Sequence, residues 1–284
     1  MRRNLRRNNR QTSESYKYTL ANTNLYETKS TSSTILTAIP SGAKVQIIDG
    51  EEDWYTVMYN NLTGYVPASS LSTTKYTWLD LLLRSYPSAE SNPVAMVPEK
   101  SEVQVLSVTG EWSHVVYNDQ QGYIFSYFLT DDGNSPAHYD FTYFYTDMTR
   151  FVNDNQIPSP TVNLITTDLE NKLTYVFEKG ANGLWILLYK WDCTVGKPST
   201  PTIKGTFYVS GRKPYFGTDN YRVKYATRIR GAYYYHSILF NAAGTEIIDA
   251  RLGMALSHGC IRLAVENAQW IYDNVLDASA IVIN

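Results

Sequence analysis

The segment Ser257-His258-Gly259-Cys260-Ile261-Arg262 places a thiol two residues after a histidine and two residues before an arginine. Glycine directly precedes the cysteine, so the backbone can approach another molecule there without an intervening side chain. A free thiol with a pKa of about 8.5 is only a few per cent thiolate at neutral pH, and the thiolate is the nucleophile. A reactive Cys260 therefore needs a nearby positive charge or an imidazole that takes its proton.

Two of the four histidines are candidates for that imidazole. His236 is followed by Ser237 in the apolar run Ala232–Phe240, while His258 lies next to the cysteine in sequence. In an extended segment the side chains at i and i+2 point the same way, so His258 is also able to lie beside Cys260. A single cysteine in an apolar run is more often a small core residue. The residues alone therefore leave open both a structural cysteine and the choice between two bases.

The hexapeptide, with a His-Ser pair about twenty residues upstream, resembles the active-site signature of the YkuD-type L,D-transpeptidases of peptidoglycan. The resemblance covers roughly residues 160–284. It implies that Cys260 is the nucleophile, that His236 is the general base and that the backbone carbonyl of Ser237 orients the imidazole.

The same resemblance gives roles to the neighbours of the cysteine. His258 becomes a supporting residue, the N–H groups of Gly259 and Cys260 become oxyanion donors, and Ser257 fixes the loop beside the substrate. Arg262 either binds a substrate carboxylate as a fork or forms a structural salt bridge. Asp249 is the acid nearest to the two motifs in sequence, and no role is assigned to it.

The implied activity is a cysteine-dependent acyl transfer between stem peptides that releases D-Ala and forms 3→3 cross-links. Water as acceptor gives an L,D-carboxypeptidase instead, and a catalytically inactive wall-binding protein is a further alternative. The resemblance also predicts a covalent carbapenem adduct on Cys260. The spacing of His and Cys matches no common zinc pattern, so we expect neither a metal nor another cofactor.

Composition sets wider limits. The 284 residues, 43% of them hydrophobic, suffice for two or three domains with cores. Residues 1–10 contain five arginines and no acid, which leaves the remainder at a net −7, so a nucleic-acid surface is not indicated. There is no apolar run of 18 residues, and no apolar segment follows the basic start. We expect a disordered tail over residues 1–15, no recognisable signal peptide, no integral membrane segment, and a monomer associated with the extracellular cell wall.

An internal repeat organises the first half of the chain. A shift of 58 aligns Trp54 with Trp112, and Gly64-Tyr65-Val66 with Gly122-Tyr123-Ile124. Short alternating runs separated by Asn60-Asn61 and Asn118-Asp119 predict about five strands per unit. The pattern resembles tandem bacterial SH3 domains at residues 16–72 and 73–131. Such domains bind cell-wall peptide or glycan, although a spacer role fits the same residues.

The rest of the chain predicts a linker and then a second β domain. Residues 132–160 combine a polar linker with an amphipathic helix, whose apolar positions are Phe141, Phe144, Tyr145, Met148, Phe151 and Val152. Residues 161–284 contain strands at 162–167, 173–178, 184–191, 222–230 and 232–240, a helix after Arg262 and a closing strand at 280–283. A Gly-Lys-Pro loop at 196–202 is expected to lead into a strand that flanks the site. Cys193 is expected at a strand end without a role. The fold is therefore expected to be mainly β, with two SH3-like barrels followed by an L,D-transpeptidase-type sandwich that has a short C-terminal helix.

Overall fold

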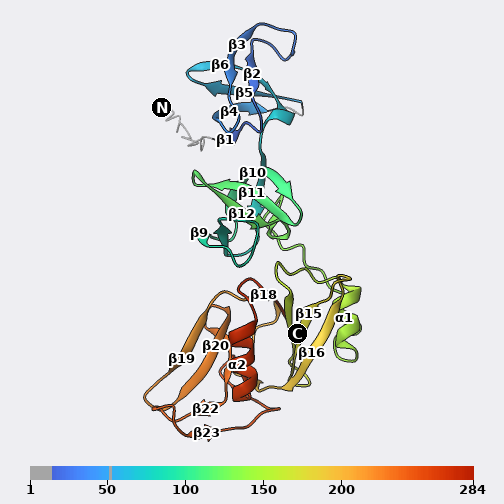
Figure 1. The fold of residues 1–284 in the computed structure, drawn as a ribbon, viewed down its shortest axis with the longest axis vertical. Coiled ribbons are helices and arrows are strands. Elements are labelled where there is room, and N and C mark those ends of the chain that lie inside the picture. Colours follow the sequence, from blue (N-terminus) through green and yellow to red (C-terminus); the bar gives the residue numbers. More distant parts are fainter. Residues whose placement is uncertain (1–14, 51–52) are drawn as a thin grey trace, which may run out of the picture. The chain divides into compact units, whose positions relative to one another are not determined.

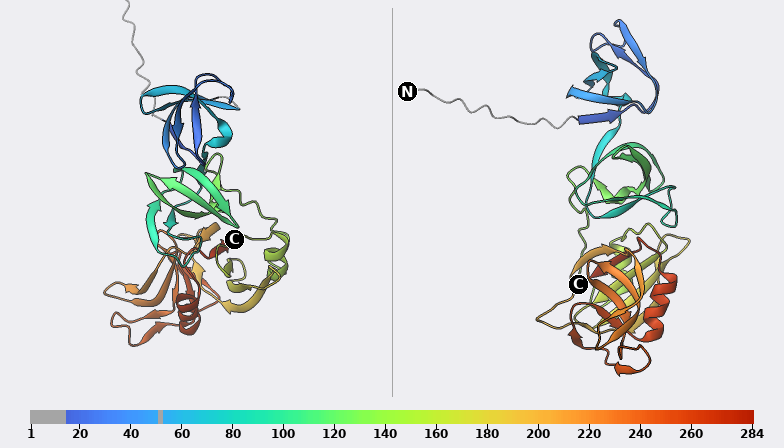
Figure 2. Two further views of the ribbon diagram at one scale, coloured as in Figure 1. Left: turned by 45° about the horizontal axis from the view of Figure 1, so that its top comes forward. Right: turned by 90° about the vertical axis from the view of Figure 1, so that its left-hand side faces the viewer.

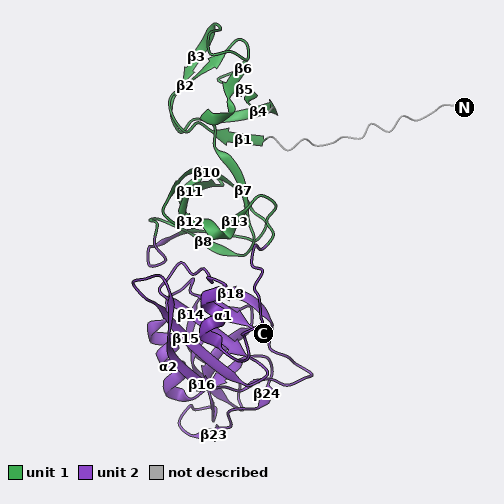
Figure 3. Cartoon of the chain, turned by 90° about the vertical axis from the view of Figure 1, so that its right-hand side faces the viewer, with its two compact units in different colours: residues 1–87, 94–134 green, residues 88–93, 135–284 purple. Residues whose placement is uncertain are grey.

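The computed structural model describes residues 15–50 and 53–284, as Figure 1 shows. The chain divides into two compact units, residues 1–87 with 94–134 and residues 88–93 with 135–284 (Figure 3). The tail predicted for residues 1–15 lies outside the described residues except for Ser15, which begins a strand. Among the described helices, none has the length and apolar character needed to cross a bilayer.

The first unit contains two small barrels, visible as curled sheets in Figure 2. The strands of the first barrel are β1 (Ser15–Tyr18), β2 (Thr23–Tyr26), β3 (Ile35–Ile39), β4 (Lys44–Gly50), β5 (Trp54–Tyr59) and β6 (Leu62–Pro67), in the sheet order β1-β4-β5-β6-β2-β3. Those of the second are β7 (Thr73–Thr77), β8 (Leu81–Arg84), β9 (Pro93–Val97), β10 (Glu102–Thr109), β11 (Trp112–Tyr117), β12 (Gln120–Phe125) and β13 (Leu129–Thr130), in the order β13-β7-β10-β11-β12-β8-β9.

The repeat of 58 is confirmed strand by strand, because each of β1 to β6 begins 58 residues before its counterpart among β7 to β12. The repeated glycines have a common steric cause. A Cβ on Gly64 would lie 2.6 Å from the carbonyl oxygen of Tyr26, and one on Gly122 would lie 2.7 Å from that of Arg84. Each glycine therefore lets its strand approach a neighbouring backbone closely.

The predicted turns and apolar positions also have the same structural roles in both barrels. Asn60 and Asn61 adopt positive φ, as do Asn118 and Asp119, which is the backbone of a tight hairpin turn. The buried core of the first barrel consists of Leu25, Ile39, Val45, Val57, Val66 and Leu71. Leu83, Val97, Val103, Val115 and Ile124 are buried at the corresponding positions of the second. Alternation along each strand thus produced two separate small cores.

The second unit is built on two main sheets. One has the order β16-β15-β14-β26-β18 and consists of β14 (Asn163–Asp168), β15 (Leu173–Lys179), β16 (Trp185–Asp192), β18 (Gly205–Tyr208) and β26 (Ala280–Ile283). The other has the order β23-β22-β20-β21-β25, with β19 added beside β20, and consists of β19 (Arg212–Gly217), β20 (Arg222–Arg230), β21 (Tyr233–Ser237), β22 (Leu239–Phe240), β23 (Ile247–Asp249) and β25 (Ile261–Leu263). The short strands β17 (Val195–Gly196) and β24 (Ala255–Ser257) pair in parallel.

Both sheets and helix α2 (Val265–Asn274) share one core, which makes this unit the expected sandwich. Ile165 and Ile281 of the first sheet, Tyr235 and Ile261 of the second, and Ile271 of α2 all belong to the same buried cluster. The hydroxyl of Tyr235 lies 2.8 Å from Oγ1 of Thr167 on the opposite sheet. Figure 1 shows α2 beside β20, where it covers the edge of this core.

Two elements differ from expectation. Helix α1 spans only Met148–Asp154, because the Asp147 side chain caps the Arg150 N–H and begins the helix there. The preceding aromatics instead lie in turns, where the Phe144 ring meets that of Phe151 edge to face, with the ring centroids 4.8 Å apart. The strand predicted for 232–240 is broken at Ile238, whose N–H bonds to the carbonyl of Leu263 instead.

Candidate active site

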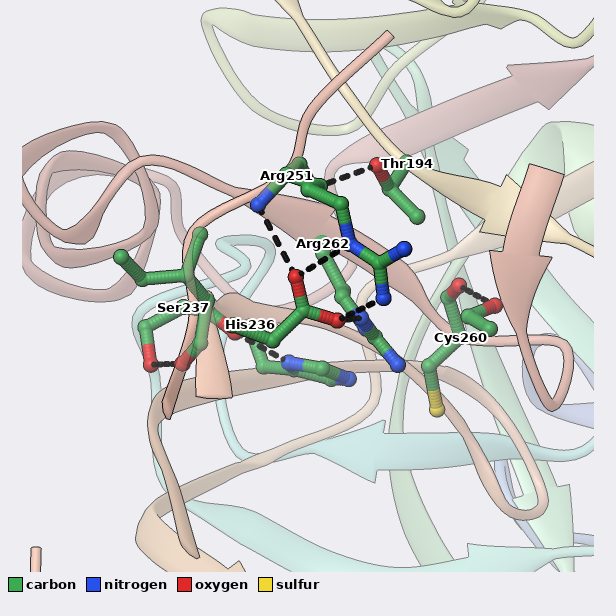
Figure 4. Close-up of polar contacts among 9 residues, drawn as sticks. Thr194, His236, Ser237, Arg251, Cys260 and Arg262 are labelled. Carbon is green, nitrogen blue, oxygen red and sulfur yellow. Dashed lines mark hydrogen bonds and ion pairs between the residues drawn. The ribbon is translucent and has the colours of Figure 1, made fainter. Parts of the chain in front are cut away.

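The site is built on the parallel pairing of β21 with β25. In this ladder Tyr235 pairs with Ile261 and His236 with Arg262. Tyr235 and Ile261 are both fully buried in the sandwich core, so the alternating neighbours His236 and Arg262 project from the opposite face. Cys260 directly precedes β25, two residues before Arg262. Two segments more than twenty residues apart are thus brought together, and Figure 4 shows the side chains of both.

His236 is held in one tautomer by its own strand. Its Nδ1 lies 2.7 Å from the carbonyl oxygen of Ser237, which is the contact implied by the sequence resemblance. A carbonyl only accepts, so Nδ1 carries the proton and Nε2 keeps a lone pair. Burial lowers the pKa of His236 to about 4, the charge on Arg262 acts in the same direction, and the bond to Ser237 opposes them. At neutral pH the imidazole is therefore neutral and able to accept a proton.

Cys260 is half-buried, and its thiol lies 3.4 Å from the carbonyl oxygen of Ala232. Burial raises the pKa of this thiol, while a hydrogen bond with the Tyr234 backbone and the positive charge of Arg262 act against the increase. A raised pKa favours the neutral thiol at neutral pH. The arrangement thus combines a neutral thiol with a neutral base, which is suited to proton removal during attack on a substrate.

The loop that presents the cysteine is held by Ser257. The Ser257 hydroxyl donates to the carbonyl of Cys260 at 2.5 Å and accepts from the N–H of Gly259 at 3.1 Å. The side chain is buried, so these contacts give Ser257 the loop-fixing position. Because the Gly259 N–H already donates to the Ser257 hydroxyl, it is not the free oxyanion donor that was expected.

Glycine at 259 satisfies two requirements of this loop. Its φ is +113°, a conformation that residues with a side chain rarely adopt, and a Cβ there would lie 2.6 Å from Cε1 of Tyr233. The Tyr233 ring thus covers the backbone immediately before the cysteine. His258, by contrast, is exposed and makes no hydrogen bond with any residue in the described part of the chain, so it lacks there the local contacts expected of a supporting residue.

The Gly-Lys-Pro loop packs directly on the cysteine loop. Oγ1 of Thr202 donates to the carbonyl of Gly259 at 2.8 Å and accepts from the N–H of Gly196 at 2.8 Å. The Lys197 N–H donates to the carbonyl of Ser257 at 3.0 Å. The loop therefore flanks the site as expected, whereas the following strand β18 belongs to the other sheet.

Arg262 forms a salt bridge, one of its two expected roles, with a partner that the sequence analysis did not assign. Its Nη1 lies 3.1 Å from Oδ2 of Asp249, and Arg251 binds the same carboxylate through Nε at 2.9 Å and Nη2 at 3.0 Å. The Arg262 side chain is only 9% exposed, which favours a structural salt bridge over the binding of a substrate carboxylate. In Figure 4 the side chain extends toward the region between His236 and Cys260, and Arg251 reaches Thr194 through its carbonyl.

Sequence reasoning assigned no role to Asp249, Arg251 or Thr202. Asp249 ends strand β23, eleven residues before Cys260 and thirteen before Arg262, and no spacing rule links it to the cysteine motif. Cys193, the other cysteine, is fully buried and unpaired, and burial raises its pKa to about 12. This position agrees with the absence of an assigned role.

Comparison with known families agrees with this geometry. Residues 162–283 match the L,D-transpeptidase catalytic domain model, YkuD, and residues 21–72 and 80–130 match the bacterial SH3 domain model. The second unit therefore carries an L,D-transpeptidase catalytic domain of the YkuD family, and two bacterial SH3 domains precede it. Both identities were expected from the sequence motifs.

Individual relatives are more distant. The chain is 28% identical over 127 residues to the putative L,D-transpeptidase YciB of Bacillus subtilis, and the alignment covers 42% of this chain but less than two thirds (64%) of that relative. A fused Zn-dependent amidase/peptidase/peptidoglycan-binding domain-containing protein from Clostridium acetobutylicum is 39% identical over 55% of this chain and 69% of its own, with a TM-score of 0.41. An L,D-transpeptidase from Mycobacterium smegmatis is 20% identical over 68% and 70%, with a TM-score of 0.38.

Proposed function

We propose that this protein is a cysteine-dependent L,D-transpeptidase that joins peptidoglycan stem peptides by 3→3 cross-links. The observation that supports the proposal is the β21–β25 pairing, in which a His236 that is neutral at neutral pH pairs with Arg262, two residues after Cys260. The YkuD match of residues 162–283 supports the same activity class.

In the first half-reaction the Cys260 sulfur attacks the carbonyl carbon of the third stem residue. His236 Nε2 takes the thiol proton, since Nδ1 is occupied by the Ser237 carbonyl. The tetrahedral intermediate carries its negative charge on the former carbonyl oxygen, for which the Cys260 N–H is the proposed donor. The C–N bond to D-Ala then breaks, and the imidazolium returns its proton to the leaving amine. A thioester on Cys260 remains.

In the second half-reaction the side-chain amine of another stem's third residue attacks the thioester. Its proton passes to His236 and then to the departing thiolate, so the enzyme is regenerated as a neutral pair. The raised pKa of the thiol suits this step, because the restored thiol is not held as a charged group in a partly buried loop.

The decisive experiment compares Cys260→Ala with Cys193→Ala in the full-length protein. A synthetic tetrapeptide stem is the substrate, and release of D-Ala is measured. We expect Cys260→Ala to abolish release and Cys193→Ala to retain it, because Cys193 is sealed in the core. Unchanged release by Cys260→Ala contradicts the proposed nucleophile. His236→Gln should reduce release by about 10²-fold or more.

Mass analysis of the products separates transfer from hydrolysis. With an acceptor stem present, a cross-linked dimer supports the transpeptidase, whereas a tripeptide alone identifies an L,D-carboxypeptidase. Incubation with a carbapenem should add one inhibitor mass to the intact protein, and Cys260→Ala should remove that adduct. A protein that binds walls but turns over no stem peptide is the inactive alternative.

We further propose that the two SH3 domains hold the enzyme, as a monomer, on the extracellular cell wall, where its stem-peptide substrate is found. The match of residues 21–72 and 80–130 to bacterial SH3 domains supports this location. Full-length Cys260→Ala should sediment with purified walls, since its binding does not depend on turnover. Failure to sediment contradicts wall binding. Analytical ultracentrifugation should give a mass near 32.3 kDa.

A further inference from the structure

Basic side chains are concentrated on the β19–β20 hairpin beside the active site. Residues 212–230 contain six basic residues and one acid, although the whole chain has a net charge of −2. The six are Arg212, Lys213, Arg222, Lys224, Arg228 and Arg230. An excess of one sign next to a reactive group attracts ligands of the opposite charge.

Two of these cations surround one tyrosine. The Lys213 ammonium lies 5.6 Å from the centroid of the Tyr234 ring, and the Arg228 guanidinium lies 5.5 Å from it. Nε of Arg228 also donates to the Tyr234 hydroxyl at 3.0 Å. Tyr234 is 6% exposed, so its ring fixes the spacing of the two charges from below.

This cluster adjoins the catalytic pair through direct contacts. Tyr234 lies two residues before His236 on β21, and the ring of Phe216 packs on both, at 5.2 Å from Tyr234 and 5.5 Å from His236. The Tyr234 backbone also hydrogen-bonds Cys260. Two residues along a strand span about 7 Å, so the cluster lies within about two residue lengths of the catalytic pair along an extended peptide.

No ion pair of Lys213 or Arg228 is found within the described residues. Neither Lys213 nor Arg228 has a carboxylate within salt-bridge distance there, whereas Arg212 pairs with Asp277 and Arg262 with Asp249. Lys213 is exposed and Arg228 is half-buried, so both can reach a ligand on the surface. In this sheet Arg212 and Arg262 are therefore each compensated by a carboxylate, whereas the described residues supply none to Lys213 or Arg228.

We propose that Lys213 and Arg228, held around Tyr234, form a carboxylate subsite for the stem peptide, one residue away from the carbonyl that Cys260 attacks. This inference rests on the proposed function and specifies which part of the substrate is recognised. A fork of guanidinium donors and a mobile ammonium together suit a carboxylate next to a scissile bond. The subsite orients the donor peptide so that its carbonyl meets the sulfur.

The test uses two tetrapeptide stems that differ in one group. One carries a free carboxylate on the residue before the diamino acid, and in the other that carboxylate is an amide. In full-length protein, Lys213→Gln and Arg228→Gln should each raise KM for the free-carboxylate stem about tenfold, with little change in kcat. For the amide stem both variants should match the unmodified protein. Added salt should weaken binding of the charged stem only.

Two controls separate recognition from folding. Arg228→Lys keeps the charge and should restore most of the affinity, while a purely structural hydrogen bond to Tyr234 would not be restored. Lys179→Gln removes another lysine that lies over an aromatic ring, Trp185, on the other sheet, and should change neither KM. An equal increase in KM for both stems in Lys213→Gln or Arg228→Gln would overturn the proposal.

Weakened binding of a phosphate-bearing wall polymer, with an unchanged KM for both stems, would also overturn it in favour of an anionic-polymer site. These outcomes are independent of the proposed activity, which is tested separately by whether Cys260→Ala abolishes release of D-Ala. If Lys213→Gln and Arg228→Gln remain active and keep the preference of the unmodified protein between the two stems, the subsite is rejected while the proposed activity is not.

Discussion

The buried ion pair between Arg262 and Asp249 gives the sharpest stability prediction. Their side chains are only 9% and 14% exposed, and the two atoms lie 3.1 Å apart. Removing one partner of a buried pair costs about 3–5 kcal/mol, because the other charge is left without compensation. Asp249→Asn keeps the side-chain shape but leaves Arg262 and Arg251 facing each other without a carboxylate. We expect a loss of about 3 kcal/mol in the free energy of unfolding of this domain.

The measurement must report on the catalytic domain alone, since a chain with several domains does not unfold in one step. Urea-dependent hydrogen exchange of peptides spanning β21 and β25 provides such a local readout. Asp154→Asn is the matched control. It breaks an i,i+4 pair with Arg150 whose side chains are 53% and 55% exposed, which should cost only about 0.3–0.5 kcal/mol.

Equal effects of Asp249→Asn and Asp154→Asn on exchange would refute the reasoning, because burial would then not distinguish the pairs. A second readout concerns the thiol. Without Asp249 the charge of Arg262 acts on Cys260 with less opposition, so the thiol pKa should fall and alkylation at a fixed pH should become faster. Slower alkylation would contradict the position assigned to Arg262.

Three further predictions follow from the same site. The pKa of His236 is about 4 in the folded protein and about 6.5 in the unfolded chain, so between pH 6.5 and pH 4 the unfolded chain binds a proton that the folded protein does not. The free energy of unfolding should therefore fall by about 3 kcal/mol from pH 7 to pH 4 in unfolding titrations. His236→Gln should remove this contribution to the pH dependence. Gly259→Ala should cost about 1–3 kcal/mol and most D-Ala release, whereas Gly183→Ala, with positive φ but open space around it, should cost about 1 kcal/mol and leave turnover intact. Iodoacetamide should modify only Cys260 in the native protein and also Cys193 after unfolding, as peptide mass mapping would show; native modification of Cys193 would contradict its burial.

Local patterns predicted much of the fold. The 58-residue repeat determined both barrels because every strand and turn of one unit has its counterpart in the other, down to the glycines at 64 and 122. Alternating apolar residues also located β14, β15, β16 and β20 to within about a residue. The aromatics around Phe144 misled the helix prediction, since helical spacing does not reveal that Asp147 starts the helix.

The candidate site was only partly accessible in this way. The motif singled out Cys260 and His236, and the Ser237 carbonyl lies where the resemblance implied. The engagement of the Gly259 N–H by Ser257 and the exposure of His258 were not apparent, because both depend on the path of one loop. Side-chain direction in a loop has no period that a sequence pattern could reveal.

The sequence by itself determined the elements whose causes are local: alternation for strands, asparagine and glycine for turns, and a short motif for the chemistry. Only the tertiary structure decided which strands meet. The parallel contact of β21 with β25 joins segments separated by 25 residues, and Asp249 reaches Arg262 from a third segment. Such contacts depend on burial of a core shared by two sheets, a property of the whole domain that no single stretch of residues contains.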